Sequence, residues 1–240
     1  MTGRVIAYRA RGIDFIFMLT RDDRTITDCL DVVGSIASLG LGHIGFKDVG
    51  VDLETMRRLN RAIKAAGATS YLEIVSIEGE ACRNAARVAL DVGVDRLLGG
   101  TEVEDVLEIL RGRIAYYPFP GRPAGHPTRL GGGPRDVAAD CKRFRELGCA
   151  GVDLLAYRAT DAGPLSLVRA ARRATDGSLI VAGSIDRPDR VKALAEAGAD
   201  AFTIGSAAFD ATFSPQKRSL SSQLRDIMVI CDTANNAPKD

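Results

Sequence analysis

Lys47 and Glu73 are the two side chains in this sequence whose types and positions best suit proton transfer. Each lies in a short apolar run that is typical of a buried strand, and side-chain alternation turns both toward the same interior. A lysine among apolar walls can form an imine or stabilise a developing anion, while a neighbouring carboxylate moves protons. The alternative is an ion pair that only fills the interior, because buried charges are costly unless they are paired.

Asp22 and Asp23 follow the first apolar run, residues 13–20, and form a second candidate pair. A carboxylate at the end of a strand can act as a general acid or base, so both are predicted catalytic groups. Aspartate also favours the cap position of a helix, and a helix that begins near Thr25–Thr27 would use one of them in that way. Both roles stay open for this pair.

Two glycine–serine pairs, Gly183–Ser184 and Gly205–Ser206, each follow an apolar run and precede a helical pattern. Glycine lets the backbone close on an anion, and the N–H groups at a helix start supply donors and a partial positive charge. We therefore expect the two pairs to bind the phosphate of a small phosphorylated metabolite. The simpler interpretation is that both glycines are only tight turns between a strand and a helix.

The segment 118–134 is rich in proline and glycine and is predicted to be a long loop that closes over the site. It carries His126, a candidate catalytic group. Arg122 and Arg129 lie on either side of this histidine and are candidates for binding a carboxylate or a second phosphate. The alternative for each loop arginine is a solvated surface charge.

A repeated unit must position these residues: an amphipathic helix, a glycine that ends it, and a short apolar run. Glycine adopts the left-handed conformation that terminates a helix, and the apolar run after it is typical of a buried strand. The clearest copy is 197–205, and eight strands result when we add 13–20, 39–47, 66–75, 92–100, 114–119, 147–158 and 179–182. Eight strand–helix units predict a single-domain α/β protein, a (β/α)8 TIM barrel over residues 1–240.

Alternation along these strands divides their residues between an outer face and the barrel interior. The residues expected to pack under the helices are Ile44, Phe46, Leu155, Tyr157, Phe202 and Ile204. The residues expected to line the interior are His43, Gly45, Lys47, Arg96, Leu98, Gly100, Leu154, Ala156, Arg158, Ala201, Thr203 and Gly205. Gly100 and Arg158 then share the top layer with Lys47 and join the candidate substrate-binding residues. Asp153 and His43, at the opposite strand ends, are expected to be structural.

The composition favours a folded protein of a reducing compartment. The chain has 46% hydrophobic and 26% charged residues, which is typical of a globular protein. A net charge of +1, without an apolar run near the length of a membrane helix, predicts neither a nucleic-acid nor a membrane partner. Five cysteines without paired spacing predict a cytoplasmic location. Residues 1–11 are expected to be a lead-in, and residues 233–240 a flexible tail after a last helix near Leu220–Cys231.

No cofactor is predicted from the sequence. The two histidines are far apart, and no cluster of His, Asp and Glu has ligand spacing, which argues against zinc. Magnesium held by Asp22, Asp48 or Glu73 stays open, because barrel metals use carboxylates from several strands. A homo-oligomer also stays open.

The last quarter of the sequence resembles a known family. Residues 181–185 (VAGSI) and 191–207 (VKALAEAGADAFTIGSA) are similar to the C-terminal quarter of the ribulose-phosphate-binding (β/α)8 barrels, most like the HisA/HisF-like branch of histidine biosynthesis. The resemblance implies a TIM barrel that holds a phosphate ester through the backbone of Gly183–Ser184 and Gly205–Ser206. In that branch two aspartates at the ends of the first and fifth strands perform acid–base catalysis. The resemblance therefore implies this role for Asp22 or Asp23, whereas residues 114–119 end without a carboxylate.

Together these observations predict a phosphosugar-processing enzyme of the aldolase or decarboxylase type, a carbon–carbon lyase, or an isomerase. The reaction is expected to pass through an enolate or a Lys47 iminium intermediate. One alternative is a HisA-like sugar-phosphate isomerase that uses aspartate acid–base chemistry. The other is a non-catalytic barrel that binds a phosphorylated metabolite.

Overall fold

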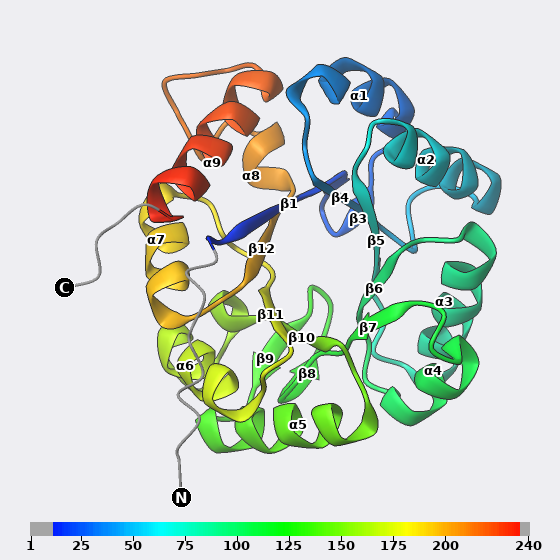
Figure 1. Cartoon of the computed structure of the whole chain (residues 1–240), viewed down its shortest axis with the longest axis vertical. Coiled ribbons are helices and arrows are strands. Elements are labelled where there is room, and N and C mark those ends of the chain that lie inside the picture. Colours follow the sequence, from blue (N-terminus) through cyan, green and yellow to red (C-terminus); the bar gives the residue numbers. More distant parts are fainter. Residues whose placement is uncertain (1–11, 236–240) are drawn as a thin grey trace, which may run out of the picture.

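Eight parallel strands form the centre of the molecule in a computed structural model that describes residues 12–235. They are β1 (Asp14–Met18), β4 (His43–Lys47), β5 (Thr69–Ile74), β6 (Arg96–Gly99), β7 (Ala115–Tyr117), β10 (Gly151–Leu154), β11 (Ser178–Val181) and β12 (Ala201–Ile204). Hydrogen bonds join them in the order β10-β11-β12-β1-β4-β5-β6-β7. Figure 1 shows the helices arranged in a ring around these strands.

The helices follow the strands along the chain, as the repeat predicts. They are α1 (Cys29–Ile36), α2 (Leu53–Ala65), α3 (Gly79–Val92), α4 (Val103–Leu110), α5 (Pro134–Leu147), α6 (Pro164–Ala174), α7 (Pro188–Ala197), α8 (Ser206–Phe209) and α9 (Leu220–Asn235). Two short 3₁₀ helices, η1 (Ala37–Leu39) and η2 (Ala156–Arg158), follow α1 and β10.

The two ends of the strand order meet between β7 and β10. The N–H of Ala150 donates a hydrogen bond to the Tyr116 carbonyl, and the N–H of Asp153 donates one to the Pro118 carbonyl, both at 3.0 Å. These bonds join the sheet into a barrel. The predicted single-domain (β/α)8 TIM barrel is confirmed.

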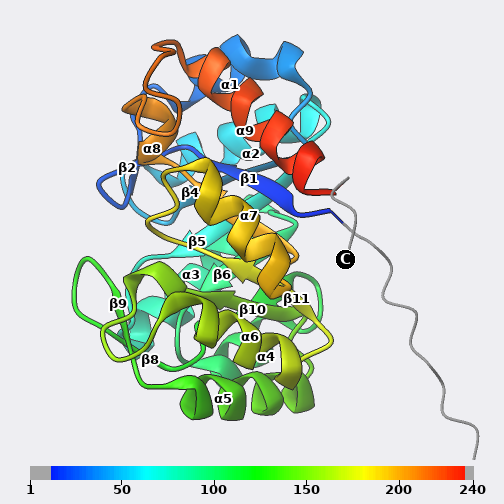
Figure 2. The same ribbon diagram turned by 90° about the vertical axis from the view of Figure 1, so that its left-hand side faces the viewer.

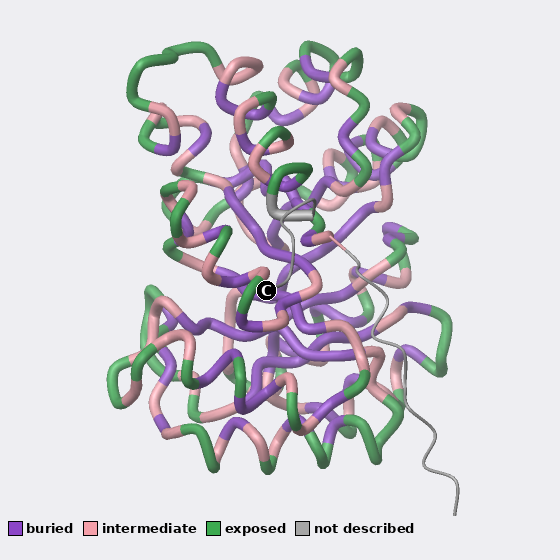
Figure 3. The backbone as a smooth tube through the Cα atoms, turned by 60° about the vertical axis from the view of Figure 1, so that its left-hand side comes forward, coloured by how far each residue is buried: buried purple, intermediate pink, exposed green. Residues whose placement is uncertain are grey.

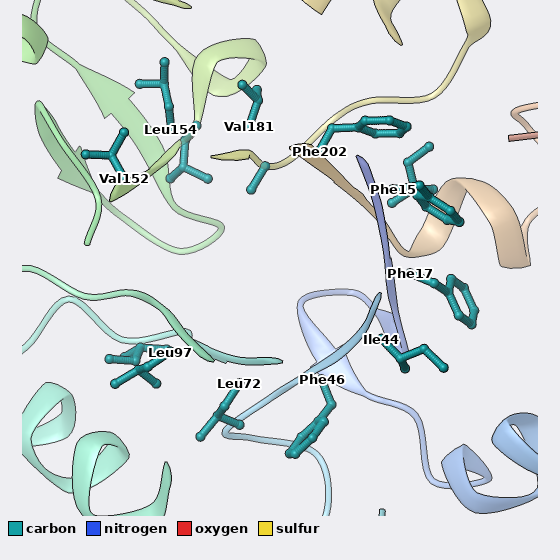
Figure 4. Close-up of a cluster of buried hydrophobic side chains, with 14 of the residues drawn as sticks. Phe15, Phe17, Ile44, Phe46, Leu72, Leu97, Val152, Leu154, Val181 and Phe202 are labelled. Atoms are coloured by element: carbon teal, nitrogen blue, oxygen red, sulfur yellow. The ribbon is translucent and has the colours of Figure 1, made fainter. Parts of the chain in front are cut away.

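The outer faces of the strands carry the larger hydrophobic core. Phe15, Phe17 and Phe46 belong to it, and Figure 4 shows these side chains pointing away from their strands. Removing a side chain of this size from water stabilises the fold by about 1.5–3 kcal/mol. In Figure 3 the strands are buried along their length, whereas exposed residues recur on the helices around them. The outward positions predicted for Phe46 and Phe202, among others, are confirmed.

A second cluster fills the inside of the barrel. It consists of Ile16, Met18, Tyr71, Leu98, Tyr117, Ile180 and Ala201. Toward the N-terminal ends of the strands, His43 Nδ1 lies 3.0 Å from the Tyr71 hydroxyl oxygen, and the Arg96 guanidinium lies 5.6 Å from the centre of the Tyr71 ring. This packed interior supports the structural role expected of His43. Because the interior is filled there, we expect a functional site at the carboxyl ends of the strands.

Two short hairpins project from the carboxyl ends of the strands, on the left in Figure 2. The first joins β2 (Thr20–Arg21) to β3 (Arg24–Thr25), with Asp22 and Asp23 as the two corner residues. Their φ angles of 49° and 56° are both left-handed, as a tight two-residue hairpin requires. Neither aspartate caps a helix, because α1 begins only at Cys29.

The second hairpin lies within the segment predicted to be an irregular loop, residues 118–134. It pairs β8 (Arg122–Ala124) with β9 (Arg129–Gly131). The Thr160 N–H donates a hydrogen bond of 2.9 Å to the Leu130 carbonyl, and Leu130 is fully buried. The predicted long loop therefore contains an ordered hairpin that is anchored to the residues after η2.

The sixth barrel strand faces the opposite way from the prediction. Leu154 belongs to the outer core, whereas Asp153 pairs with the interior residue Ile180 and Leu155 lines a cavity. The prediction aligned Asp153 with the aspartates of other repeats. Positions counted from Gly148, which ends the preceding helix, give the other register. An odd shift in register exchanges the two faces of a strand, so Leu154 lies on the outer face and Asp153 in the interior.

The ends of the described chain also differ from the prediction. Helix α9 continues to Asn235, one turn beyond the expected end, so residues 233–235 are helical. The predicted lead-in, 1–11, and the remainder of the predicted tail, 236–240, lie outside the described residues. Within residues 12–235, no helix has the length and apolar character needed to span a membrane.

Candidate active site

A cavity of about 300 Å³ opens at the carboxyl ends of the strands. Lys47, the last residue of β4, and Glu73, near the end of β5, both line it. Gly183–Ser184 after β11 and Gly205–Ser206 after β12 line it as well. The structure therefore brings the two proton-transfer candidates into one space with both glycine–serine pairs.

Lys47 is buried and forms two ion pairs in this cavity. Its Nζ atom lies 2.7 Å from Asp23 Oδ1 and 3.2 Å from Glu73 Oε1. Burial alone lowers the pKa of Lys47, but the Glu73 and Asp23 carboxylates outweigh burial, and the net effect raises this pKa. Lys47 is therefore a stable ammonium group in this arrangement.

Asp23 joins this lysine to Arg158. Its two carboxylate oxygens accept hydrogen bonds of 3.1 Å from the two terminal nitrogens of the Arg158 guanidinium. Burial alone raises the pKa of Asp23, but the hydrogen bonds and charges of Arg158 and Lys47 outweigh it and lower the pKa to about 2. A carboxylate with so low a pKa is a weak base, so Asp23 is better suited to binding cations than to moving protons.

Arg158 reaches the site from η2 rather than from the end of a strand. Its side chain packs on Gly183, where a Cβ atom would lie only 2.5 Å from Arg158 Nε. Gly183 also has a left-handed φ of +79°, which glycine adopts without strain. One terminal nitrogen of Arg158 lies 3.5 Å from the Thr128 carbonyl oxygen. Arg158 thus connects both hairpins and the loop after β11 at the mouth of the cavity.

The second glycine–serine pair begins the short helix α8. The N–H groups of Ser206 and Ala207, its first two residues, have no acceptor within a helix. Both residues line the cavity. Asp186 and Asp210 line it too, and each is paired with an arginine, Asp186 with Arg190 at 3.1 Å and Asp210 with Arg21 at 3.3 Å.

A second cavity of about 550 Å³ adjoins the first and shares Asp23, Arg158, Ser184 and Ser206 with it. Two predicted residues, the exposed side chains Asp22 and Arg129, line this second cavity. Both therefore lie beside the candidate site rather than in its deepest part.

Three predicted site residues lie elsewhere. Gly100 turns toward the outer core, where a Cβ atom would lie 3.0 Å from Ile74 Cδ1. Arg122 is 71% exposed and forms an ion pair with Asp136 at 2.7 Å. His126 is exposed near the tip of the second hairpin and lies outside the lining of both cavities. Gly100 faces outward because the left-handed turn at Gly99 and Gly100 ends the strand alternation on which its inward position was predicted.

Two carboxyl groups near the Lys47–Glu73 pair were not predicted as proton-transfer groups. Asp48 accepts a hydrogen bond of 3.0 Å from the Val75 N–H, and burial is the main cause that raises the pKa of Asp48 to about 6. Asp153 is completely buried inside the barrel, and burial followed by the charge of Glu73 raises the pKa of Asp153 well above its usual range. Counting strand positions from Gly148 would have placed Asp153 inside the barrel.

The carboxylates considered for magnesium do not gather in one place. Asp22 lies at an exposed hairpin corner, Asp48 accepts a backbone N–H, and Glu73 is paired with Lys47. In the part of the chain that the structure describes, no group of three or more His, Cys, Asp or Glu side chains is arranged to hold a metal ion.

Comparisons of the sequence with protein-family models and with curated proteins find no match. Solved structures do share its fold. A mutant tryptophan synthase alpha subunit from the hyperthermophile Pyrococcus furiosus is 15% identical with a TM-score of 0.64, covering 93% of this chain and 99% of that chain. A chain of the tryptophan synthase complex from Pyrococcus furiosus is 16% identical with a TM-score of 0.62, covering 90% and 96%.

A designed, cube-shaped protein cage made by fusing symmetric oligomeric domains also matches, with 13% identity, a TM-score of 0.63, and 92% of this chain and 73% of that chain covered. At such identities the likeness shows the (β/α)8 barrel fold. The resemblance to the HisA/HisF-like branch stays a prediction.

Proposed function

We propose that this protein is a lyase or isomerase that acts on a small phosphorylated, sugar-like substrate through an enolate. The observation that carries the proposal is the cavity in which the buried Lys47–Glu73 pair lies beside both glycine–serine turns. A base, a cation and backbone donors in one enclosed space are the groups that enolate chemistry on a phosphate ester needs.

Glu73 is the proposed base. Its carboxylate takes a proton from the carbon next to the substrate carbonyl, and the electron pair of the broken C–H bond moves onto the carbonyl oxygen. The ammonium group of Lys47 stabilises the negative charge on that oxygen. The proton returns to the former carbonyl carbon while the proton of the adjoining hydroxyl moves to the former carbonyl oxygen, and the new carbonyl completes an isomerisation. In a lyase, Glu73 takes a hydroxyl proton instead, and the C–C bond breaks with its electron pair forming the enolate.

The charge of Lys47 favours the enolate over an iminium. An imine forms from a neutral amine, and two carboxylates within 3.2 Å hold the proton on this lysine and raise its pKa. The reaction proposed here takes its base and its cation from the chain itself and needs no cofactor. The five unpaired cysteines, four of them buried, support the cytoplasm as the proposed location.

The phosphate site is tested by thermal denaturation in the presence of phosphorylated sugars, each beside its unphosphorylated parent. A ligand at one hundred times its dissociation constant stabilises a protein by about 2.7 kcal/mol, which raises Tm measurably. We expect stabilisation by phosphate esters alone. Equal shifts with both members of each pair, or no shift, would contradict phosphate recognition.

The base is tested with Glu73→Gln, assayed on the phosphate ester that stabilises the protein best. We expect kcat to fall by a factor of about 10²–10⁴ while binding is retained, because the amide cannot accept the proton. Glu108→Gln, an exposed change on α4, is the control and keeps wild-type activity. Full activity of Glu73→Gln would exclude Glu73 as the base.

Two variants separate the proposal from its alternatives. Lys47→Met should lose turnover, and treatment of the wild type with borohydride and substrate should leave Lys47 unmodified. Covalent trapping at Lys47 would instead show an iminium. Loss of activity in Asp22→Asn, with activity retained in Lys47→Met, would favour the aspartate-dependent isomerase. Tight binding without turnover of any phosphate ester would favour the non-catalytic barrel.

A further inference from the structure

Asp153 is a buried acidic side chain in the barrel interior that lacks hydrogen-bond partners within the described residues. Its exposure is 0%, and both carboxyl oxygens lack a hydrogen-bond partner among residues 12–235. Only its backbone is engaged, through the hydrogen bond that its N–H donates to Pro118. An ionised carboxylate in such a place would be very costly, whereas an uncharged acid costs far less.

The cations near Asp153 are already paired with other groups. The charges that act on it come from Glu73 on β5, Lys47 on β4 and Arg158 on η2. Lys47 binds Asp23 and Glu73, and Arg158 binds Asp23. The two positive charges are thus balanced by the carboxylates of Asp23 and Glu73. An ionised Asp153 would add a third buried negative charge, and neither cation is free to balance it.

The strands on either side of β10 offer Asp153 no further charge. β7 and β11 contribute Tyr117 and Ile180 to the barrel interior, and α5 packs on the outer side of the strand. Of Tyr117 and Ile180, only Tyr117 is titratable, and its hydroxyl accepts a hydrogen bond from Arg96. The surroundings of Asp153 therefore favour the form without charge.

We propose that Asp153 is an uncharged carboxylic acid at neutral pH, and that by staying uncharged it keeps the neighbouring Glu73 ionised as the base. This second part rests on the proposed function. Asp153 lines neither cavity, so it acts through Glu73 as a positioning residue. A negative charge on Asp153 would lie beside the charge of Glu73, and this repulsion disfavours ionisation of Asp153.

The charge state is tested by the pH dependence of folding in Asp153→Asn and wild type. Aspartate in the unfolded chain ionises near pH 4, while the folded wild type keeps the Asp153 proton. Between pH 4 and the folded pKa, the folding equilibrium constant of the wild type should fall tenfold per pH unit relative to the variant, whose amide does not titrate. Asp31→Asn, at an exposed position on α1, should show no such slope. Parallel curves for wild type and Asp153→Asn overturn the proposal.

A measurement on the wild type keeps the test valid should Asp153→Asn fail to fold. With aspartate ¹³C-labelled at the side-chain carboxyl, one signal should keep the chemical shift of a protonated acid at pH 7. Titration of every aspartate signal to the ionised form by that pH overturns the proposal.

The positioning role is tested by the pH profile of kcat/KM. Ionisation of Asp153 at high pH would place a further negative charge beside the enolate, so the alkaline limit should move to higher pH in Asp153→Asn, whereas the acid limit should stay in place. A merely structural role would lower kcat/KM and leave both limits unchanged, which overturns this part. A folding slope without turnover of any phosphate ester would contradict the proposed function while supporting the uncharged state of Asp153, so the two failures are distinguishable.

Discussion

Asp23 binds two cations at once, and this sets its contribution to the site. Its carboxylate accepts hydrogen bonds from Lys47 and from both terminal nitrogens of Arg158, and its side chain is 12% exposed. A carboxylate paired in this way stabilises the folded state as long as it is ionised. Asp23 therefore holds the mouth of the barrel together, whereas Glu73 remains the candidate for proton transfer.

We predict that Asp23→Asn destabilises the protein by about 2 kcal/mol at pH 7, since one pKa unit corresponds to about 1.4 kcal/mol. The folded pKa of Asp23 is lowered to about 2 from its usual 3.8. Its contribution is therefore present above pH 3.8 and is lost as the pH falls toward 2. Denaturant unfolding of both proteins at several pH values measures this difference. A difference that stays constant down to pH 2 would contradict the prediction.

The loop between β11 and α7 is the element that brings backbone and cation together. Gly183 lets the Arg158 side chain lie against the backbone, and the next residue, Ser184, also has a left-handed φ, of 57°. Non-glycine residues adopt this region at some cost, which is typical of functional loops. The loop thus holds the Arg158 side chain against its backbone through two successive left-handed residues.

We predict that Gly183→Ala weakens phosphate-ester binding at least tenfold, because the new methyl group displaces Arg158. The left-handed backbone adds a destabilisation of about 1 kcal/mol. Gly67→Ala is the matched control, since Gly67 has a φ of +81° and a methyl group added there would meet no atom within 4 Å beyond its chain neighbours. Titration calorimetry and thermal unfolding of both variants separate the two effects. Equal binding by both variants would exclude a role for the Gly183–Arg158 contact.

At the scale of the whole molecule, the barrel places four carboxyl groups around two cations. Asp23 and Glu73 pair with the cations, whereas Asp48 and Asp153 do not. Burial raises the pKa of both unpaired groups, to about 6 in Asp48. The free energy of unfolding therefore decreases as the pH rises toward the pKa values of these two groups. Raised pKa values of this kind are common at functional sites.

We predict that Asp48→Asn is as stable as the wild type near pH 4 and more stable above pH 6, by about 2–3 kcal/mol. The folded pKa is raised, so the contribution of the protonated Asp48 is complete below pH 3.8 and is lost as the pH rises through 6. The asparagine oxygen can still accept the Val75 N–H, so the amide replaces the neutral acid. Thermal unfolding from pH 4 to pH 8 tests this, and equal pH dependence of both proteins would contradict it.

The local sequence pattern predicted the barrel architecture and the placement of several candidate site residues. Helix-ending glycines followed by apolar runs predict the barrel, and strict alternation predicts the inward positions of Lys47 and Glu73. The glycine–serine pairs were also identified as candidates from local pattern, because glycine permits backbone conformations that other residues adopt only at a cost. Their shared cavity follows from the fold, since the carboxyl ends of all barrel strands lie on one face.

The charge states of the buried groups and the contacts across the mouth of the barrel depend on residues that are far apart in the sequence. Sequence pattern could not show that Asp23 binds Arg158, a residue 135 positions away, or that Arg122 and His126 point away from the cavity. Asp153 was assigned to the wrong face because its strand was aligned on the aspartates of other repeats, and a register error of an odd number of residues reverses a whole strand. Charge state depends on burial and on neighbours from several strands, and these are set only when the barrel closes.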